Sequence, residues 1–149
     1  MSLNRNNISI RRNAVVLAYI ENMNAEANQL IFIKNSIKND EVFYKNDKPL
    51  YGYSYNTTIT NESTIALRFI SVKWNVFELN KNYEIFSSSL RGQKPLILPL
   101  ESFSYKSNLA IESEFGAIEA YFLFQDVISK DFIEIKSVLI QLHPEYYMN

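Results

Sequence analysis

The first clear periodicity of apolar positions lies in residues 12–28, RNAVVLAYIENMNAEAN. Apolar side chains recur there at intervals of four, three and four residues, which places them on one face of a helix. Asn13 is suited to the N-cap, because its side-chain oxygen can accept a backbone N–H of the first turn. A strand over residues 14–19 is the alternative, since β-branched valines favour extended structure. We favour the helix, within an N-terminal extension of residues 1–29, and its apolar face consists of Val16, Ile20, Met23 and Ala27.

From residue 30 the pattern becomes that of short β-strands. The runs LIFIKNSI and EVFY are separated by Asn39 and Asp40, a pair that predicts a turn. The next run, YGYSYNTTIT, alternates apolar and polar positions with the period of two that is typical of a half-buried strand. The triplet NES that follows predicts another turn. The residues that the alternation places on the apolar face are Tyr51, Tyr53, Tyr55 and Ile59.

The run TIALRFISVKWNVF contains two sets of apolar positions that a regular strand cannot bury on one face. Leu67 and Phe69 have one parity, whereas Val72 and Trp74 have the other. Since a shift of one residue turns every following side chain to the opposite face, both sets can point inward only if the strand is interrupted. We therefore predict a β-bulge or bend near residues 69–71.

Two further β-type runs complete the domain. AIEAYFLFQD is apolar on both faces, as expected of a central strand. A turn predicted at VISKD leads into a last strand, FIEIKSVLIQL. About seven to eight short strands joined by short turns favour an all-β sandwich or barrel. We assign residues 30–144 to this single domain and residues 145–149 to a C-terminal tail.

Composition narrows the class of protein without identifying a function. The 149 residues suffice for one domain, and the net charge of −1 argues against direct binding of duplex nucleic acid. The absence of cysteine excludes disulfides and thiolate chemistry. No apolar run reaches the roughly 18 residues of a membrane span, and no secretory pattern is seen. Because Arg5, Arg11 and Arg12 precede any acidic residue, as in organelle transit segments, we expect a cytoplasmic or mitochondrial protein that is not secreted.

The segment 87–107, SSSLRGQKPLILPLESFSYKS, combines one of the three glycines of the chain with two of its four prolines. Together with its neighbours it resembles the ApaG domain family over roughly residues 30–144. The pattern of that family contains a Ser-x-x-Trp strand, a Gly-x-Gly-x-x-Gly loop, two proline positions, a Phe-x-Tyr-x-Ser strand and a late Gly and Tyr. The matching residues of this chain are Ser71, Trp74, Gly92, Pro95, Pro99, Phe103, Tyr105, Ser107, Gly116 and Tyr121.

The resemblance implies an immunoglobulin- or fibronectin-III-like β-sandwich with no established enzymatic activity. In bacteria the family consists of small stand-alone proteins with a genetic link to cobalt and magnesium tolerance. In eukaryotes the domain occurs in F-box proteins and in a polymerase-interacting mitochondrial protein, where it resembles a partner-recognition module. The implied partners are therefore proteins, including those of a large multi-subunit or ribonucleoprotein assembly of organellar or ribosomal kind.

The chain departs from the family pattern in the loop. Two of the three loop glycines are replaced, by Ser87 and Ser89, and only Gly92 remains. Glycine-rich loops cradle phosphate because bare backbone can approach it closely, and serines are less suited to this. The β-type pattern after the loop also excludes the helix that a dinucleotide-binding loop requires. We expect Gly92 to form a turn, Pro95 and Pro99 to rigidify an edge segment, and SFSYKS to form the next strand.

The remaining residues predict neither a catalytic nor a metal site. A nucleophile at Ser87 or Ser89 would need a base, and the only histidine, His143, is expected at the end of the last strand. Carboxylates could offer Mg²⁺ oxygen ligands, but nothing fixes their convergence, so we interpret them as solvated loop residues. They are Glu112 and Glu114, expected on one face of an extended segment, with Asp126, Asp131 and Glu134 elsewhere.

The aromatic residues form either a binding platform or a core, and we expect a core. The inner faces of a sandwich interdigitate, so Trp74 and Phe103 are expected inside. Tyr146 and Tyr147 follow Pro144 and lie beyond the predicted sandwich, where a partner could cover them. The platform alternative would also use Tyr51, Tyr53, Tyr55 and Tyr121.

The sequence thus predicts a non-enzymatic protein-interaction module or assembly subunit without a cofactor. The candidate interaction loop consists of Ser87, Ser89, Arg91 and Gly92. The further candidate partner contacts are Val16, Ile20, Met23, Tyr146 and Tyr147. The alternative function is the binding of phosphate-bearing molecules or Mg²⁺ at the same loop, in keeping with the link of the family to divalent-cation homeostasis.

Overall fold

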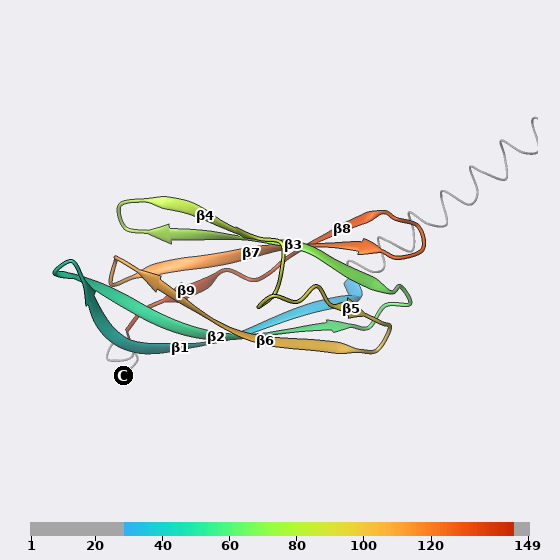
Figure 1. Cartoon of the computed structure of the whole chain (residues 1–149), viewed down its shortest axis with the longest axis horizontal. Helices are drawn as coiled ribbons and strands as arrows, with labels where there is room; N and C mark the ends of the chain where they lie inside the picture. The colour runs from blue at the N-terminus through green and yellow to red at the C-terminus, as the bar shows by residue number, and fades with distance from the viewer. Residues whose placement is uncertain (1–28, 145–149) are drawn as a thin grey trace, which may run out of the picture.

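The computed structural model describes residues 29–144, which form two facing β-sheets (Figure 1). The first sheet has the strand order β1 (Ile31–Lys45), β2 (Lys48–Asn61), β6 (Ser102–Ile111). The second has the order β4 (Asn82–Ser87), β3 (Leu67–Glu78), β7 (Gly116–Asp126), β8 (Phe132–Lys136), with the short strands β5 (Leu96–Ile97) on β3 and β9 (Ile140–Leu142) on β7. All of these pairs are antiparallel.

This architecture confirms the predicted all-β sandwich. The helix predicted over residues 12–28 lies outside the described residues. Within residues 29–144, no helix has the length and apolar content needed to span a bilayer.

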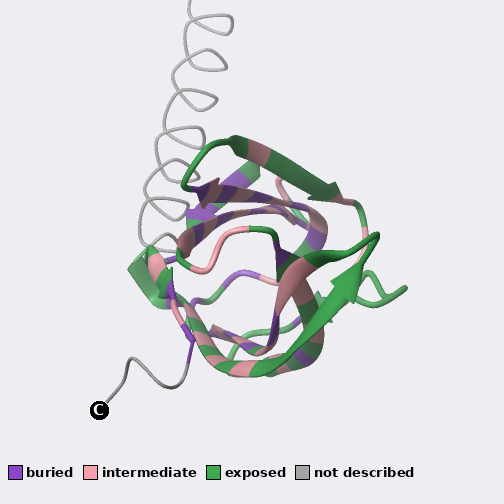
Figure 2. Ribbon diagram, turned by 90° about the vertical axis from the view of Figure 1, so that its left-hand side faces the viewer, coloured by how far each residue is buried: buried purple, intermediate pink, exposed green. Residues whose placement is uncertain are grey.

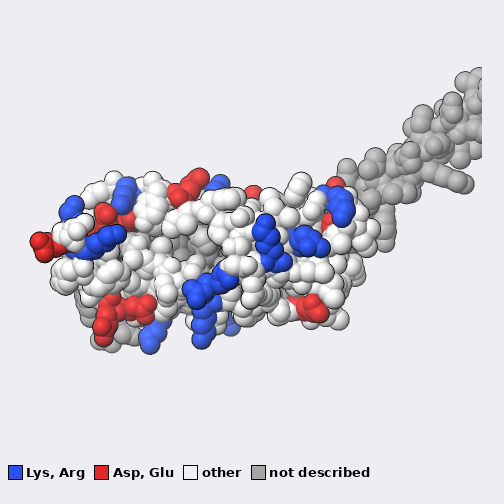
Figure 3. Space-filling model, in the orientation of Figure 1, with Lys and Arg blue, Asp and Glu red and all other residues white. Residues whose placement is uncertain are grey.

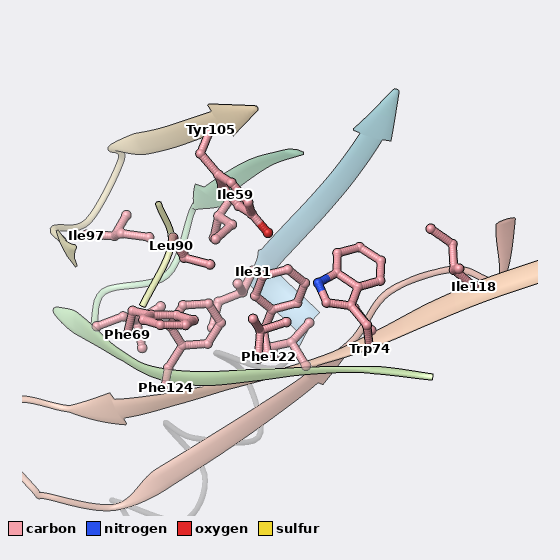
Figure 4. Packing of buried hydrophobic residues seen from close by; sticks show 14 of the residues in the cluster. Ile31, Ile59, Phe69, Trp74, Leu90, Ile97, Tyr105, Ile118, Phe122 and Phe124 are labelled. Atoms are coloured by element: carbon pink, nitrogen blue, oxygen red, sulfur yellow. The ribbon is translucent and has the colours of Figure 1, made fainter. Parts of the chain in front are cut away.

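The inner faces of the two sheets bury a common apolar layer (Figures 2 and 4). Phe122 and Phe124 of β7 lie with parallel rings, and Phe122 meets Trp74 of β3 edge-on. Trp74 is 7% exposed, and Phe103 packs partly buried against the same layer, so the inward orientation predicted for both is confirmed. The alternation of YGYSYNTTIT likewise buries Tyr53, which is 1% exposed.

The interruption predicted in the strand TIALRFISVKWNVF is confirmed. In the pairing of β3 with β7, Phe69 lies opposite Phe124, but the next pair is Ser71 with Leu123. Ile70 is therefore an extra residue in β3, and the ladder contains a bulge at this point. Because the bulge changes the parity, the apolar residues on both sides of it point into the sandwich.

The turn predicted at Asn39 and Asp40 is wrong. β1 continues through these residues as one strand, with a bulge between Asn39 and Val42. The chain reverses at a second Asn-Asp pair, Asn46 and Asp47, whose φ angles are 53° and 61°. Two successive positive φ values are those of a two-residue type I′ hairpin turn, which matches the twist of the strands that it joins.

The single last strand predicted over FIEIKSVLIQL is also wrong, because residues 137–139 separate β8 from β9. Ser137 is buried, and its Oγ accepts the N–H of Ala120 at 2.9 Å, while its own N–H donates to the carbonyl oxygen of Ala120 at 2.8 Å. A side chain thus replaces a backbone acceptor and interrupts the ladder. With this break and the short β5, the described residues contain nine strands rather than the seven to eight expected.

Asn61, at the end of β2, is a buried polar residue that joins several segments. Its Nδ2 donates to the carbonyl oxygens of Ile65 at 2.7 Å and Ile97 at 3.0 Å. Its Oδ1 accepts the N–H of Ser63 at 3.0 Å, within the NES turn predicted from the sequence. Asn61 therefore fixes both this turn and β5 against the end of β2.

Replacement of Asn61 by alanine is expected to lower the free energy of unfolding by about 3 kcal/mol, since buried carbonyl and N–H groups lose their partners. The matched control is Asn56→Ala on the same strand, where the side chain is exposed and a change below about 0.5 kcal/mol is expected. Urea denaturation at neutral pH measures both values. Equal stability of the two variants would contradict the role assigned to Asn61.

Candidate functional site

The connection between β4 and β5 carries the predicted interaction loop, Ser87–Gly92, across the gap between the sheets (Figure 1). Leu90 and Gln93 exchange backbone hydrogen bonds of 2.7 and 3.1 Å, so that Arg91 and Gly92 form a two-residue turn. Their φ angles of 55° and 80° are those of a type I′ turn. The turn predicted at Gly92 is confirmed.

Leu90 anchors this loop to the body of the domain. Its side chain is 2% exposed and belongs to the buried apolar layer. Figure 4 shows it pointing into the space between the sheets, in the same layer as Ile59 and Ile97. The turn that follows is thereby held at the edge of the sandwich, with the Arg91 side chain exposed.

Ser87 and Ser89 form a local turn instead of an open cradle. The Ser87 hydroxyl donates to the carbonyl oxygen of Ser89 at 2.6 Å and accepts the N–H of Ser89 at 3.2 Å. These groups have partners inside the loop, so binding an anion with them would first require those hydrogen bonds to break. The replacement of two family glycines by serines therefore weakens any phosphate cradle formed by the loop backbone.

An open space of about 190 Å³, here called the apolar cleft, lies beside the loop between β4 and β6. These are edge strands of their sheets, so no other described strand continues either sheet beyond them. The floor of the cleft is apolar, and hydroxyl and guanidinium groups lie at its rim. Its lining includes Tyr55, Trp74, Ile85, Ser87, Ser89, Leu90 and Arg91.

Ile85 marks the place where the buried layer is incomplete. It lies directly opposite Trp74 in the β3–β4 pair, so both side chains face the interior. Yet Ile85 is 40% exposed, whereas Trp74 is 7% exposed. Because Ile85 stays partly exposed although it faces the interior, the cleft presents uncovered apolar surface.

A second space of about 340 Å³, here called the basic hollow, adjoins the apolar cleft. Its cationic lining residues are Lys38, Arg91 and Lys106, and no acidic residue lines it. The four salt bridges between described residues all involve other lysines. Figure 3 shows Lys and Arg side chains gathered over the middle of the face that carries β6. The residues shared with the cleft are Tyr55, Arg91, Ser107 and Asn108.

Tyr55 lies between the two spaces and lines both. Its ring contacts that of Trp74, with 5.2 Å between the centroids. Burial raises the pKa of its hydroxyl above the ordinary value, while a hydrogen bond with Ser107 and the positive charge of Arg91 lower that pKa in part. The hydroxyl is therefore protonated at neutral pH and can act as a hydrogen-bond donor.

The only histidine of the chain does not meet the candidate serines. His143 follows β9, as predicted, and lines a separate hollow with Phe115 and Leu142. Ser87 and Ser89 line the apolar cleft instead.

The candidate metal-binding carboxylates are dispersed. Glu112 and Glu114 lie in the turn between β6 and β7, and the extended segment predicted for them is wrong. Glu112 pairs with Lys81 at 3.2 Å, and Asp126 accepts the N–H of Ile128 at 2.9 Å. Among residues 29–144 no three His, Cys, Asp or Glu side chains are grouped so as to hold a metal ion. The remaining two carboxylates are Asp131, before β8, and Glu134, within it.

Two sets of predicted residues remain: Tyr121, from the alternative aromatic platform, and the candidate partner contacts in the terminal segments. Tyr121 lies on the outer face of its sheet, where the ammonium groups of Lys73 and Lys136 lie 5.0 and 5.7 Å from its ring centroid. The candidate partner contacts outside the described residues are Val16, Ile20, Met23, Tyr146 and Tyr147.

Three residues of the site were not predicted: Ile85, Lys38 and Lys106. The alternation of their strands gives the face on which each lysine lies, but not that the two converge. That depends on β1 and β6 pairing on either side of β2, where Lys38 lies opposite Ser54 and Lys106 opposite Asn56.

The family model described as DUF525, ApaG domain, matches residues 41–126, and the chain belongs to this family. Two similar relatives bear the name Protein ApaG. That of an Azoarcus species is 33% identical over 69 residues, which are 46% of this chain and 54% of the relative. That of Vibrio vulnificus is 25% identical over 84 residues, which are 56% of this chain and 67% of the relative. The chain thus spans between about half and two thirds of the lengths of these relatives.

A solved structure with the same fold is an X-ray structure from the Northeast Structural Genomics Consortium. It aligns with a TM-score of 0.74 at 19% sequence identity, over 79% of this chain and 89% of the other. At this identity the likeness concerns the fold alone.

Replacement of Gly92 by alanine is expected to lower the free energy of unfolding by about 1 kcal/mol, because a side chain in the left-handed region strains the backbone. Contact with the rest of the domain does not contribute, since no heavy atom beyond Gly92 and its two chain neighbours lies within 4 Å of the position of the added Cβ. Gly92→Asn is the matched variant and should lose less, because asparagine tolerates this conformation. Urea denaturation measures both, and equal losses would contradict the explanation by backbone strain.

Proposed function

We propose that the protein is a non-enzymatic interaction module whose apolar cleft binds a protein partner. The observation that carries this proposal is Ile85, which faces the interior but is 40% exposed beside Trp74. Partner-binding surfaces are enriched in uncovered apolar and aromatic side chains that are surrounded by polar groups. The cleft has this composition, with Ser87, Ser89 and Arg91 around its apolar floor.

The strand order supports an immunoglobulin- or fibronectin-III-like kind of sandwich. If β1, β2 and β6 take the places of strands A, B and E, this sheet has the neighbour order A, B, E of such domains. β3, β7 and β8 then take the places of C, F and G, and β4 extends this sheet at its edge. Domains of this kind commonly present edges and loops to partners, while the two sheets supply a rigid body.

The edge strands offer a second means of binding. β4 and β6 flank the cleft, and each has one side without a neighbouring strand among the described residues. Such an edge presents unpaired N–H and C=O groups that an extended peptide can pair with. A partner segment that enters the cleft would thus find apolar surface and backbone partners together.

The absence of enzymatic activity is part of the proposal. A hydrolytic serine needs a base within hydrogen-bond reach, whereas Ser87 bonds the backbone of Ser89 and His143 lines another hollow. The N-terminal extension and the tail with Tyr146 and Tyr147 are proposed as additional contacts within a larger assembly. Their amphipathic and aromatic sequences support this assignment.

A second candidate function is the binding of phosphate-bearing molecules, which the basic hollow favours. Lys38, Arg91 and Lys106 line it and no acidic residue does, and these charges attract anions and repel Mg²⁺. Titration with pyrophosphate, nucleotides and MgCl₂, followed through the amide resonance of Gly92, tests this candidate. Unchanged resonances around the loop would rule it out.

Affinity purification from the native source should recover a stoichiometric partner with the full-length protein. The Ile85→Asp variant should reduce the yield of that partner by about tenfold, because it places a charge on the apolar floor of the cleft. The matched control is Phe86→Asp on the same strand, 68% exposed, which does not line the cleft and should retain the partner. Quantitative mass spectrometry measures both yields.

A variant lacking residues 1–29, purified in parallel, measures the contribution of the extension. If the full-length protein arrives without a partner, the interaction function is refuted. If Ile85→Asp and Phe86→Asp retain the partner equally, the cleft is not its binding site.

A further inference from the structure

The basic hollow lies on the outer face of the β1–β2–β6 sheet and meets the apolar cleft at the edge strand β6, and together the two spaces define the chemistry of a ligand. Four residues line both, among them Tyr55 and Arg91, so a segment that lies along the edge of β6 can place groups in both spaces. Trp74 and Ile85 line the apolar cleft, whereas ammonium and guanidinium groups line the basic hollow. A ligand that fills both must therefore carry an apolar group beside negative charge.

We infer that the partner segment is an acidic peptide with one large apolar side chain, which inserts into the cleft while neighbouring carboxylates bind Lys38, Arg91 and Lys106. This inference rests on the proposed interaction function and names the class of partner. The binding site would be assembled from β4, β6, the Ser87–Gly92 loop and Lys38 of β1.

The size of the cleft fits a single side chain. A dry cavity of about 150 Å³ is large enough to hold benzene. The cleft, at about 190 Å³, therefore has room for a phenyl or isobutyl group on the surface of Trp74 and Ile85. Burial of that group would also cover Ile85, which the domain itself leaves 40% exposed.

The charge of the hollow favours carboxylates on the ligand. Lys38, Arg91 and Lys106 are exposed and take part in none of the four salt bridges between described residues. The nearby Asp40 lies outside the hollow lining and accepts a hydrogen bond from Ser54 at 3.0 Å. A ligand carboxylate at the rim could pair with Arg91 through two parallel hydrogen bonds, and the Tyr55 hydroxyl could donate a third.

A peptide accounts for the arrangement better than a small phosphate compound. The loop amide of Ser89 is already bonded to the Ser87 hydroxyl, which removes a donor that a phosphate cradle would use. An isolated phosphate would bind the hollow and leave the apolar cleft empty. An extended peptide places successive side chains on opposite sides of its backbone, so that apolar and acidic groups can enter adjacent spaces.

The test is selection of a display library of random twelve-residue peptides on the full-length protein. The enriched peptides should carry Asp or Glu within about three residues of Phe, Leu or Ile, as the paired spaces require. Synthetic versions should change the fluorescence of Trp74, which is the only tryptophan of the chain and lines the cleft. Their affinity should fall as the salt concentration rises.

Variants assign the binding to the two spaces. Ile85→Asp and Arg91→Glu should each weaken peptide binding by about tenfold or more, through loss of the apolar floor and reversal of a rim charge. The matched controls are Phe86→Asp and Arg68→Glu, exposed residues that line neither space, and they should leave the affinity within about twofold of the wild type. Circular dichroism verifies that each variant is folded.

Four results would overturn the inference. Neutral or basic enriched peptides that depend on Ile85 would refute the acidic class while leaving the interaction function intact. Failure to enrich any Ile85-dependent peptide would refute the proposal that the ligand is a peptide. The affinity purification described above then tests the interaction function separately. Pyrophosphate binding as tightly as the peptide, regardless of Ile85→Asp, would indicate an anion site alone. Ile85-dependent self-association in sedimentation would assign the cleft to a second copy of the chain.

Discussion

The burial of Leu90 between the two sheets is the contact on which the candidate site depends. Edge strands β4 and β6 do not meet, and the connection from β4 to β5 must cross the gap between them. The Leu90 side chain fills part of that gap and is 2% exposed. The turn at Arg91 and Gly92 is thereby fixed at the rim. Because Leu90 does not cover Ile85, an apolar space remains beside it, and the loop that closes the sandwich also forms the wall of the cleft.

The rest of the fold makes the surroundings of this space rigid. The bulge at Phe69–Ser71 allows β3 to direct apolar residues inward along its whole length, including Trp74 on the floor of the cleft. At the end of β2, Asn61 ties a turn and β5 to the body of the domain through hydrogen bonds of 2.7 and 3.0 Å. A site supported in this way loses little conformational entropy when a ligand binds, which is the advantage of a preorganised surface.

The sequence predicts those features that depend on local pattern. The change of parity across residues 69–71 required a bulge, and the alternation around Tyr53 required a half-buried strand; the structure contains both. The turn prediction from local pattern was wrong where two identical Asn-Asp pairs lie close together in the sequence. The Asn-Asp pair at residues 39–40 resembles the pair at 46–47, but only the second has the positive φ angles of a turn. The sequence alone cannot show which pair the register of β1 on β2 places at the hairpin.

The candidate site illustrates the same limit. The loop was predicted from its glycine, prolines and family pattern, and Gly92 occupies the expected turn. The exposure of Ile85 could not be predicted, because it depends on which residues of the facing sheet fail to reach it. The convergence of Lys38 and Lys106 with Arg91 likewise results from strand pairing between segments far apart in the chain.

Our main proposal is that a partner inserts a side chain into the apolar cleft between the two sheets. Methyl NMR of the full-length protein with ¹³C-labelled isoleucine, before and after addition of the captured partner or an enriched peptide, tests it most directly. We expect shifts for Ile85 and Ile118, which line the cleft, and none for Ile133, which is 2% exposed on β8 and does not line it. An unchanged Ile85 resonance in the presence of bound partner would show that the partner binds outside the cleft.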